Sequence, residues 1–313
     1  MDRHQPCSEQ GSSFHKTPFL TLDDLFWFLY LYPLRILSAL GSQKLIYGLG
    51  GLYRFRVKQR AELAAGRMLA AQSAGITRDE APRIAQRMLA NSKRRMLDDL
   101  ILSWPSQARK LRCAGIEGFE HLEQAAACGK GVVVLTAHFC ATRVAKRYLA
   151  TRGYPMLSVR DRITRGDWWG RLGKRMLEPR RRQFLGSIMG ESVYVGERDC
   201  TLKLFQRLRS GGLVHIHFDG RSGKNFATRP FLGRPRSFAT GLFEIVRLSG
   251  SAVVPMLCLG RGSGFRIRFE PALEMVPASA REEFIQANLP NFVKTLEKHI
   301  QDHPEEWEEW ISF

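Results

Sequence analysis

The segment of residues 131–143, GVVVLTAHFCATR, constrains the fold of this chain more than any other stretch. Its apolar run Val132–Leu135, rich in β-branched side chains, is typical of a buried strand in a parallel sheet. Residues 141–150 then have the pattern of a helix. His138 therefore lies where a strand leads into a helix, and this is the edge at which α/β sheets bind ligands. The alternative is a core histidine with a hydrogen-bond partner, or an incidental loop residue.

Other segments repeat this pattern and predict an α/β fold with a central mixed sheet flanked by helices. Asp219 follows the strand expected at 213–218, so we expect it at the same sheet edge as His138. His215 and His217 share one face of that strand but lack a third ligand, so we interpret them as structural rather than as a metal pair. We expect further strands at 132–136, 156–160, 193–195 and 252–258, an edge strand at 265–269, helices within 62–104 and at 201–209, 240–248 and 282–302, a turn-rich loop at 231–236 and a short link at 113–119.

The balance of charge predicts a polyanionic partner. The chain has 313 residues with 48 Lys+Arg against 30 Asp+Glu, a net charge of +18. Residues 143–182 alone carry a net +10 and include Trp168 and Trp169. Such a run suits anionic lipid head groups at a membrane interface, and it would also suit the phosphates and bases of nucleic acid. Charge alone does not choose between these two partners.

Cofactor motifs are missing from the sequence. The six cysteines show no CxxC spacing, which argues against a zinc site or a disulfide framework and favours a reducing compartment. The glycine-rich patterns GxGxxG and GxxxxGK[ST] are absent. We therefore expect neither a cofactor nor a metal. Cys140 lies close to His138, and we interpret it as a small buried hydrophobe rather than as a nucleophile.

The N-terminal part of the chain predicts contact with a membrane surface. Residues 1–18 are a polar, flexible tail without the features of a signal peptide. Residues 19–110 form a helical, membrane-associating region that begins with the aromatic stretch Leu25–Leu34. Pro33 and Arg35 interrupt the stretch, so we expect it to lie in the interface rather than to span the bilayer. The alternative is a buried helix of the main domain, which we place at 111–313.

The order of these segments resembles the lipid A biosynthesis acyltransferases, a branch of the wider lysophospholipid and glycerolipid acyltransferase superfamily. The resemblance covers nearly the whole chain after the polar tail. It rests on the aromatic stretch, on GVVVLTAHF at 131–139, on Val159-Arg160, on Val214–Asp219 with PFLGRP at 230–235, on Ala252–Pro255 and on PEEWEEW at 304–310. It implies a membrane-surface enzyme in which a histidine, here His138, removes a proton from an acceptor hydroxyl that attacks an acyl thioester.

One position departs from the family pattern. The family places Asp or Glu after the histidine and four intervening residues, whereas this chain has Arg143 there. Arginine cannot accept a hydrogen bond from the imidazole, and its charge disfavours the imidazolium. Two explanations are open: another acid, with Asp219 the best candidate, approaches His138, or Arg143 holds an anionic substrate while His138 works without an orienting acid.

We therefore predict an acyltransferase at the cytoplasmic face of the inner membrane. It would move a fatty acyl chain from acyl carrier protein or acyl-CoA to a hydroxyl of an anionic lipid. His138 and Asp219 would be catalytic, while Arg143, Arg160, Gly233 and Arg234 would bind substrate. The alternative is a pseudoenzyme that keeps the fold and the lipid-binding surface. Nucleic acid, supported by charge alone, is the partner that we do not expect.

Overall fold

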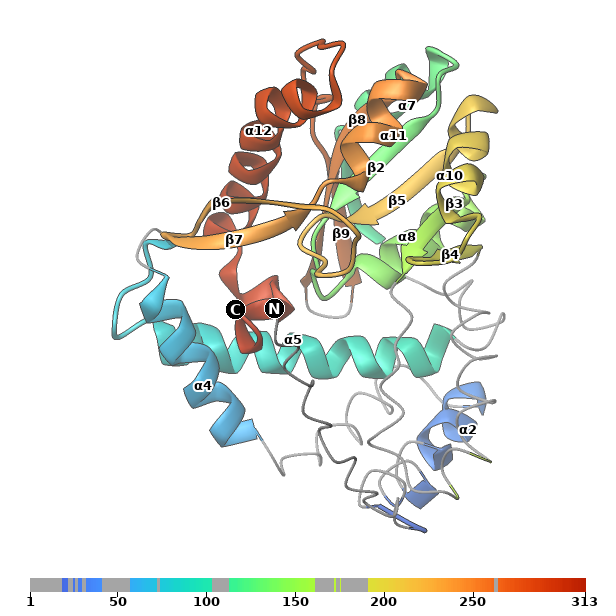
Figure 1. Ribbon diagram of the computed structural model, residues 1–313. Helices are drawn as coiled ribbons and strands as arrows, with labels where there is room; N and C mark the ends of the chain where they lie inside the picture. Colours follow the sequence, from blue (N-terminus) through green and yellow to red (C-terminus); the bar gives the residue numbers. More distant parts are fainter. Residues whose placement is uncertain are drawn as a thin grey trace, which may run out of the picture.

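The computed structural model describes residues 19–21, 25, 28–29, 32–40, 57–71, 74–102, 113–160, 172, 175, 191–261 and 264–313. Its centre is a seven-stranded mixed sheet with the order β1-β9-β8-β2-β5-β3-β4 (Figure 1). The strands are β1 (Cys113–Glu117), β2 (Val132–Thr136), β3 (Met156–Arg160), β4 (Ser192–Tyr194), β5 (Leu213–His217), β8 (Ala252–Arg261) and β9 (Gly264–Phe269). All the pairs are parallel except β8 with β9. The predicted central mixed sheet is confirmed.

Alternation along the central strand β2 explains how the two faces of the sheet are covered. Val133 and Leu135 join a core that includes side chains of α10 (Cys200–Arg209), α11 (Gly241–Ser249) and α12 (Arg281–Asp302). Val132 and Val134 point to the other face and join a core with α7 (Phe119–Ala127) and α8 (Thr142–Thr151). Because both faces of β2 are buried, its sequence is a continuous apolar run rather than an alternating one.

Gly131 sets the start of β2. Its backbone has φ 70°, in the left-handed region that side chains disfavour. A Cβ atom at this position would lie 2.4 Å from the carbonyl oxygen of Leu208 in α10. The glycine therefore permits both the turn into the strand and the close approach of the helix that packs over it.

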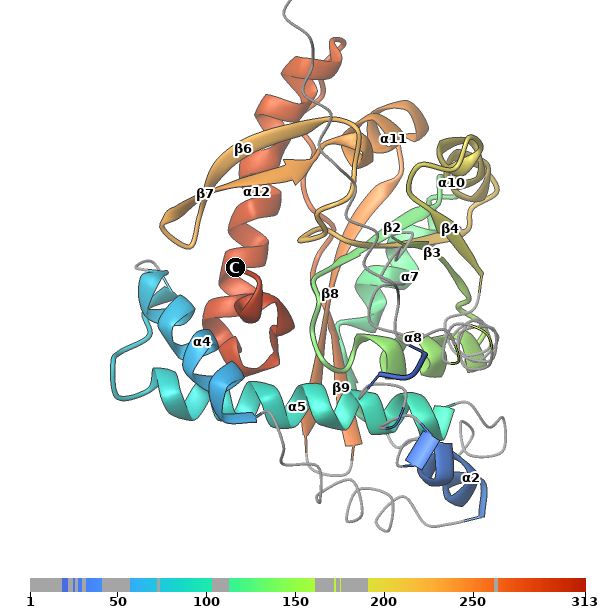
Figure 2. The ribbon, with the colours of Figure 1, turned by 60° about the horizontal axis from the view of Figure 1, so that its bottom comes forward.

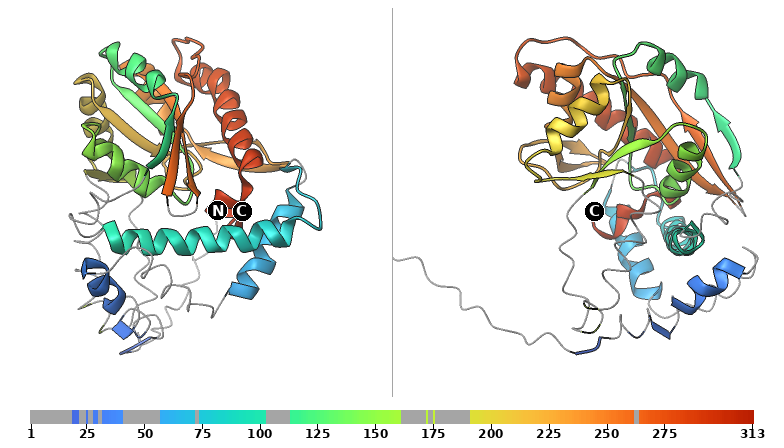
Figure 3. Two further views of the ribbon diagram at one scale, coloured as in Figure 1. Left: turned by 180° about the vertical axis from the view of Figure 1, so that it is seen from behind. Right: turned by 90° about the vertical axis from the view of Figure 1, so that its right-hand side faces the viewer.

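The long helix α5 (Ala81–Leu102) runs across one end of the sheet (Figures 1 and 3). Ala85 and Met88 of α5, with Ala64 and Met68 of α4 (Val57–Ala70), are fully buried in the same core as α10 to α12. The shorter α2 (Tyr32–Leu40) packs against α5 through Leu34. Among the described residues, no helix is both long and apolar enough to cross a membrane. The predicted tail, Trp168, Trp169 and much of the 143–182 run lie outside the described residues.

Three sequence-based expectations were wrong. The expected link at 113–119 contains strand β1, a short segment whose Gly115 and mixed polarity conceal its pairing with β9. Strand β9 is therefore not at the edge, because β1 lies beyond it. The expected loop at 231–236 is part of a hairpin of β6 (Phe226–Phe231) and β7 (Arg234–Ala239), which lies beside α12 and apart from the main sheet (Figure 2).

The sequence of residues 226–239 does not have the usual pattern of a β-hairpin, for a physical reason. Pro230 and Pro235 face each other across it, and proline has no N–H to donate to a sheet ladder. The two-residue turn places Leu232 at φ 50° and Gly233 at φ 81°, and only glycine adopts such values without strain. The buried side chain of Leu232 and the hydrogen bond from its N–H to Glu297 Oε1, at 2.5 Å, hold this conformation.

Candidate active site

The register of two neighbouring parallel strands brings His138 and Asp219 together. Thr136, the last residue of β2, pairs with His217, the last residue of β5. Each candidate lies two residues beyond its strand end, so both reach the same carboxyl edge. Nδ1 of His138 lies 2.8 Å from Oδ1 of Asp219, and the backbone N–H of His138 donates to Oδ2 at 3.0 Å. The expected approach of Asp219 to His138 is confirmed.

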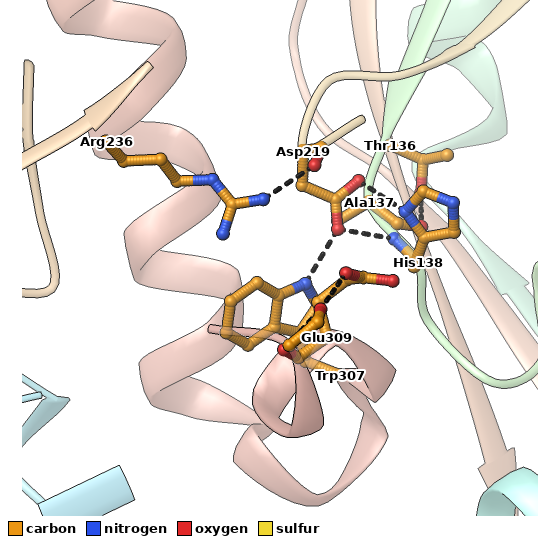
Figure 4. Close-up of polar contacts among 8 residues, drawn as sticks. Thr136, Ala137, His138, Asp219, Arg236, Trp307 and Glu309 are labelled. Atoms are coloured by element: carbon orange, nitrogen blue, oxygen red, sulfur yellow. Dashed lines mark hydrogen bonds and ion pairs between the residues drawn. The ribbon is translucent and has the colours of Figure 1, made fainter. Parts of the chain in front are cut away.

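Asp219 is buried and receives further donors (Figure 4). The indole N–H of Trp307 donates to Oδ2 at 2.7 Å, and Arg236 donates from Nη2 to the backbone carbonyl of Asp219 at 2.6 Å. Both carboxylate oxygens are thus satisfied, as a buried charge requires.

The electrostatics of the pair favour an ionised acid beside a basic imidazole. Burial acts to raise the pKa of Asp219, but the charge of His138 and the hydrogen bonds from its ring and backbone outweigh burial and hold this pKa well below its usual range. Burial likewise acts to lower the pKa of His138, but Asp219, and more weakly Glu309 and Glu308, raise it above 6.5. Since an ionised carboxylate only accepts, Nδ1 of the neutral ring carries the proton and Nε2 keeps its lone pair. The side chain of His138 is 35% exposed, so part of it is accessible to a reactant.

A C-terminal segment fixes the backbone around His138. It consists of two 3₁₀ turns, η4 (Pro304–Glu306) and η5 (Glu308–Ile311). Phe139 and Trp307 form an antiparallel bridge, the N–H of Cys140 donates to the carbonyl of Glu306 at 3.0 Å, and the N–H of Glu308 donates to the carbonyl of His138 at 3.0 Å. The segment is tied in turn to α5 by the ion pair of Glu308 with Arg95 at 2.8 Å.

Arg143 and Arg160 lie on adjacent elements of the same sheet edge. Arg143 is in the first turn of α8, and Arg160 ends β3. Between them, Lys146 is buried and donates to the buried hydroxyl of Ser158. Burial, then the charges of Arg143 and Arg160, lower the pKa of Lys146 to about 7. The charges of Arg143 and Arg160 therefore both act on the buried ammonium group of Lys146.

Gly233 and Arg234, the two residues of the β6–β7 hairpin that were predicted to bind substrate, are not the hairpin residue that contacts Asp219. Gly233 is in the turn, and the guanidinium of Arg234 lies 5.9 Å from the ring centre of Phe313. The hairpin arginine bonded to Asp219 is Arg236. Substrate binding by Gly233 and Arg234 stays a prediction.

Sequence reasoning did not place three residues at this site: Arg236 and Trp307 were given no role, and His217 was interpreted as structural. The ring of His217 stacks on that of His138, with centroids 4.3 Å apart and planes inclined by 14°. The alternation along β5 placed His217 on one face of the strand, but the residue on which it stacks, His138, follows β2, and the register between β2 and β5 brings the two together. Among the described residues, no group of three or more His, Cys, Asp or Glu side chains has the arrangement of a metal site.

The sequence model of the bacterial lipid A biosynthesis acyltransferases matches residues 14–312, nearly the whole chain. The chain belongs to this family. The lipid A biosynthesis palmitoleoyltransferase of Escherichia coli is 24% identical over 210 residues, which are 65% of this chain and 62% of that enzyme. A phosphatidylinositol mannoside acyltransferase of Mycobacterium tuberculosis is 25% identical over 202 residues, 63% of this chain and 60% of its own length.

This member of the lipid A acyltransferase family therefore aligns with less than two thirds of either relative. Among solved structures, the 1-acyl-sn-glycerophosphate acyltransferase of Thermotoga maritima shares 14% identity and a TM-score of 0.35, over 78% of this chain and 98% of that one. That likeness is too low to bear on the site.

Proposed function

We propose that this protein is an acyltransferase that moves a fatty acyl chain from the thioester of acyl carrier protein or coenzyme A to a hydroxyl of an anionic lipid. The observation that carries the proposal is the pair of His138 and Asp219. Nδ1 of the ring lies 2.8 Å from Oδ1 of the acid, and Nε2 is turned away from the acid. A base held in one tautomer and orientation by a buried carboxylate is the arrangement that activates a hydroxyl nucleophile.

In this mechanism Nε2 of His138 removes the proton of the acceptor hydroxyl as its oxygen attacks the thioester carbonyl. The carbon–sulfur bond then breaks, and the thiolate leaves with the proton that the imidazolium returns. Asp219 remains ionised throughout and stabilises the imidazolium by its charge and its hydrogen bond. No covalent intermediate on the protein is needed.

The substitution of Arg143 for the family acid is compatible with this chemistry. Asp219 supplies an acid from the turn after β5 instead of from the helix that follows His138. Arg143 and Arg160, on either side of Lys146, supply positive charge at the same sheet edge. We assign to these cations the acidic group of the acceptor or the acidic surface of the carrier protein.

Exposed apolar side chains support the membrane contact that a location at the cytoplasmic face of the inner membrane requires. Leu29, Ile36 and Leu37 are exposed near or on α2, and Leu63 and Leu69 are exposed on α4. Apolar side chains combined with a basic surface give the two signals that stable interfacial binding requires. Replacing both Ile36 and Leu37 with Asp should move the protein from the membrane pellet to the supernatant. An unchanged pellet fraction would contradict the assignment to α2.

Site-directed variants test the activity itself. His138→Ala and His138→Gln should abolish acyl transfer from an acyl carrier protein thioester to membrane lipid, while circular dichroism shows that the fold is kept. The thermal midpoint of His138→Ala should fall, because the buried carboxylate of Asp219 loses the hydrogen bond from the ring. Asp219→Asn keeps the shape of the side chain, and the same change to the acid of a serine protease triad costs about 10⁴ in rate. Mass spectrometry of lipids from cells with and without the gene would identify the product. Unchanged lipids, with no transfer in vitro from either thioester donor, would favour the pseudoenzyme.

A further inference from the structure

His217 contacts the face of the imidazole that the proposed function makes the base. The rings of His138 and His217 are nearly parallel, with centroids 4.3 Å apart. His217 also contacts the ring of His215 in a T-shaped arrangement, with centroids 4.7 Å apart and planes inclined by 89°. Because His215 is fully buried within β5, it limits the movement of His217.

The stacked ring restricts a motion that Asp219 leaves open. A single hydrogen bond at Nδ1 fixes one edge of the His138 ring, but the ring can still tilt about that bond. A flat surface against its face opposes the tilt. The direction of the Nε2 lone pair, on which transfer of a proton from a hydroxyl depends, is then set by two contacts, the hydrogen bond at Nδ1 and the stacking on the ring face.

The surrounding charges decide which of the two imidazoles takes the proton. His138 faces the carboxylates of Asp219, Glu309 and Glu308, which raise its pKa. Burial, then the charges of His138 and His215, hold the pKa of His217 well below 6.5, although the carboxylate of Asp219 acts to raise it. When His138 is protonated, it therefore stacks on a neutral ring, and the face of a neutral aromatic ring attracts a cation.

We propose that His217 is a positioning residue of this site: a neutral ring that stacks on His138, directs its Nε2 and stabilises the imidazolium. The inference rests on the proposed function, in which His138 is the base. It assigns to His217 a role in the chemistry that differs from packing, because it depends on an aromatic face and not on volume alone.

Two variants separate these roles. His217→Phe and His217→Leu both fill the space and exclude water, but only phenylalanine offers an aromatic face. With acyl carrier protein thioester as donor, the Phe variant should keep kcat within about threefold, whereas the Leu variant should lose roughly tenfold or more, with KM little changed in both. The acidic limb of the kcat/KM profile should lie about 0.4 to 1.5 pH units lower for Leu than for Phe. His121→Ala, on α7, is the control and should match the wild type.

An NMR titration makes the test independent of turnover. In protein labelled with ¹⁵N-histidine, the His138 ring, identified by its loss in His138→Ala, should titrate at lower pH in the Leu variant than in the Phe variant. Equal kcat values and equal titration midpoints for the Leu and Phe variants would overturn the inference. If His138→Ala itself retains acyl transfer, the proposed function fails, and the titration still decides whether His217 stabilises the protonated ring.

Discussion

Replacing Trp307 with phenylalanine tests whether the C-terminal segment takes part in catalysis or only in packing. The variant keeps an aromatic ring in a fully buried position but removes the N–H that donates to Asp219 Oδ2 at 2.7 Å. Trp310 provides a matched control, because it is also fully buried and its indole N–H donates at 2.8 Å to the neutral carbonyl of Pro304.

The two variants should lose different amounts of stability, because the indole of Trp307 donates to a carboxylate and that of Trp310 donates to a neutral carbonyl. A hydrogen bond to a charged group contributes about 1.5–3 kcal/mol to the free energy of unfolding, whereas a neutral one contributes about 0.5–1.5 kcal/mol. The cavity left by shortening an indole to a phenyl ring is similar in both variants. Trp307→Phe should therefore destabilise the protein by about 1 kcal/mol more than Trp310→Phe. Only Trp307→Phe weakens the hold on the acid that orients His138, and we expect its kcat to fall by roughly tenfold, or about 1.4 kcal/mol of barrier.

Urea unfolding monitored by far-ultraviolet circular dichroism gives the first comparison, and acyl transfer at saturating donor gives the second. The decisive result is a kcat that falls in Trp307→Phe and stays near that of the wild type in Trp310→Phe. Equal kcat values for the two variants would refute the argument, because they would show that Trp307 acts through packing alone.

Two further substitutions and a pH profile test the geometry elsewhere. Arg143→Glu should lower kcat and not raise it, because Asp219 already occupies the place of the orienting acid and the new carboxylate would lie beside Lys146 and Arg160. The control Arg152→Glu should have little effect. A gain in kcat for Arg143→Glu would show that an acid is missing. Gly131→Ala should lower the free energy of unfolding by at least about 2 kcal/mol, because the new Cβ would clash with Leu208. Gly129 has the same φ of 70° but open space around it, so Gly129→Ala should cost only about 1 kcal/mol. Equal losses in the two variants would contradict the clash. In the wild type, the acidic limb of the kcat/KM profile should have its midpoint above pH 6.5, because Asp219 raises the pKa of His138 and activity is lost as that ring is protonated. In Asp219→Asn, where residual activity is measurable, the midpoint should lie at lower pH.

Local sequence patterns predicted the part of the site that comes from buried parallel strands. The strands expected at 132–136 and 213–218 match β2 and β5 to within one residue, and the rule that such ends meet at one sheet edge placed the two side chains together. Trp307 donates to a residue 88 positions away, and no period within the terminal segment encodes that contact. The stacking of His217 likewise depends on the register between β2 and β5, which the sequence of neither strand specifies alone.

The C-terminal segment has a consequence for biosynthesis. The strands that carry His138 and Asp219 emerge from the ribosome well before Trp307, Glu306 and Glu308, which hold the backbone of residues 138–140 and one oxygen of the acid. The aromatic segment and α2 emerge earlier still. If the aromatic stretch and α2 bind the membrane as proposed, a nascent chain reaches it while Asp219 lacks its indole donor, and the backbone of His138 gains its C-terminal support only once the last turns have folded against α5. Translation that stops short of those turns would leave a chain in which neither His138 nor Asp219 has its C-terminal support.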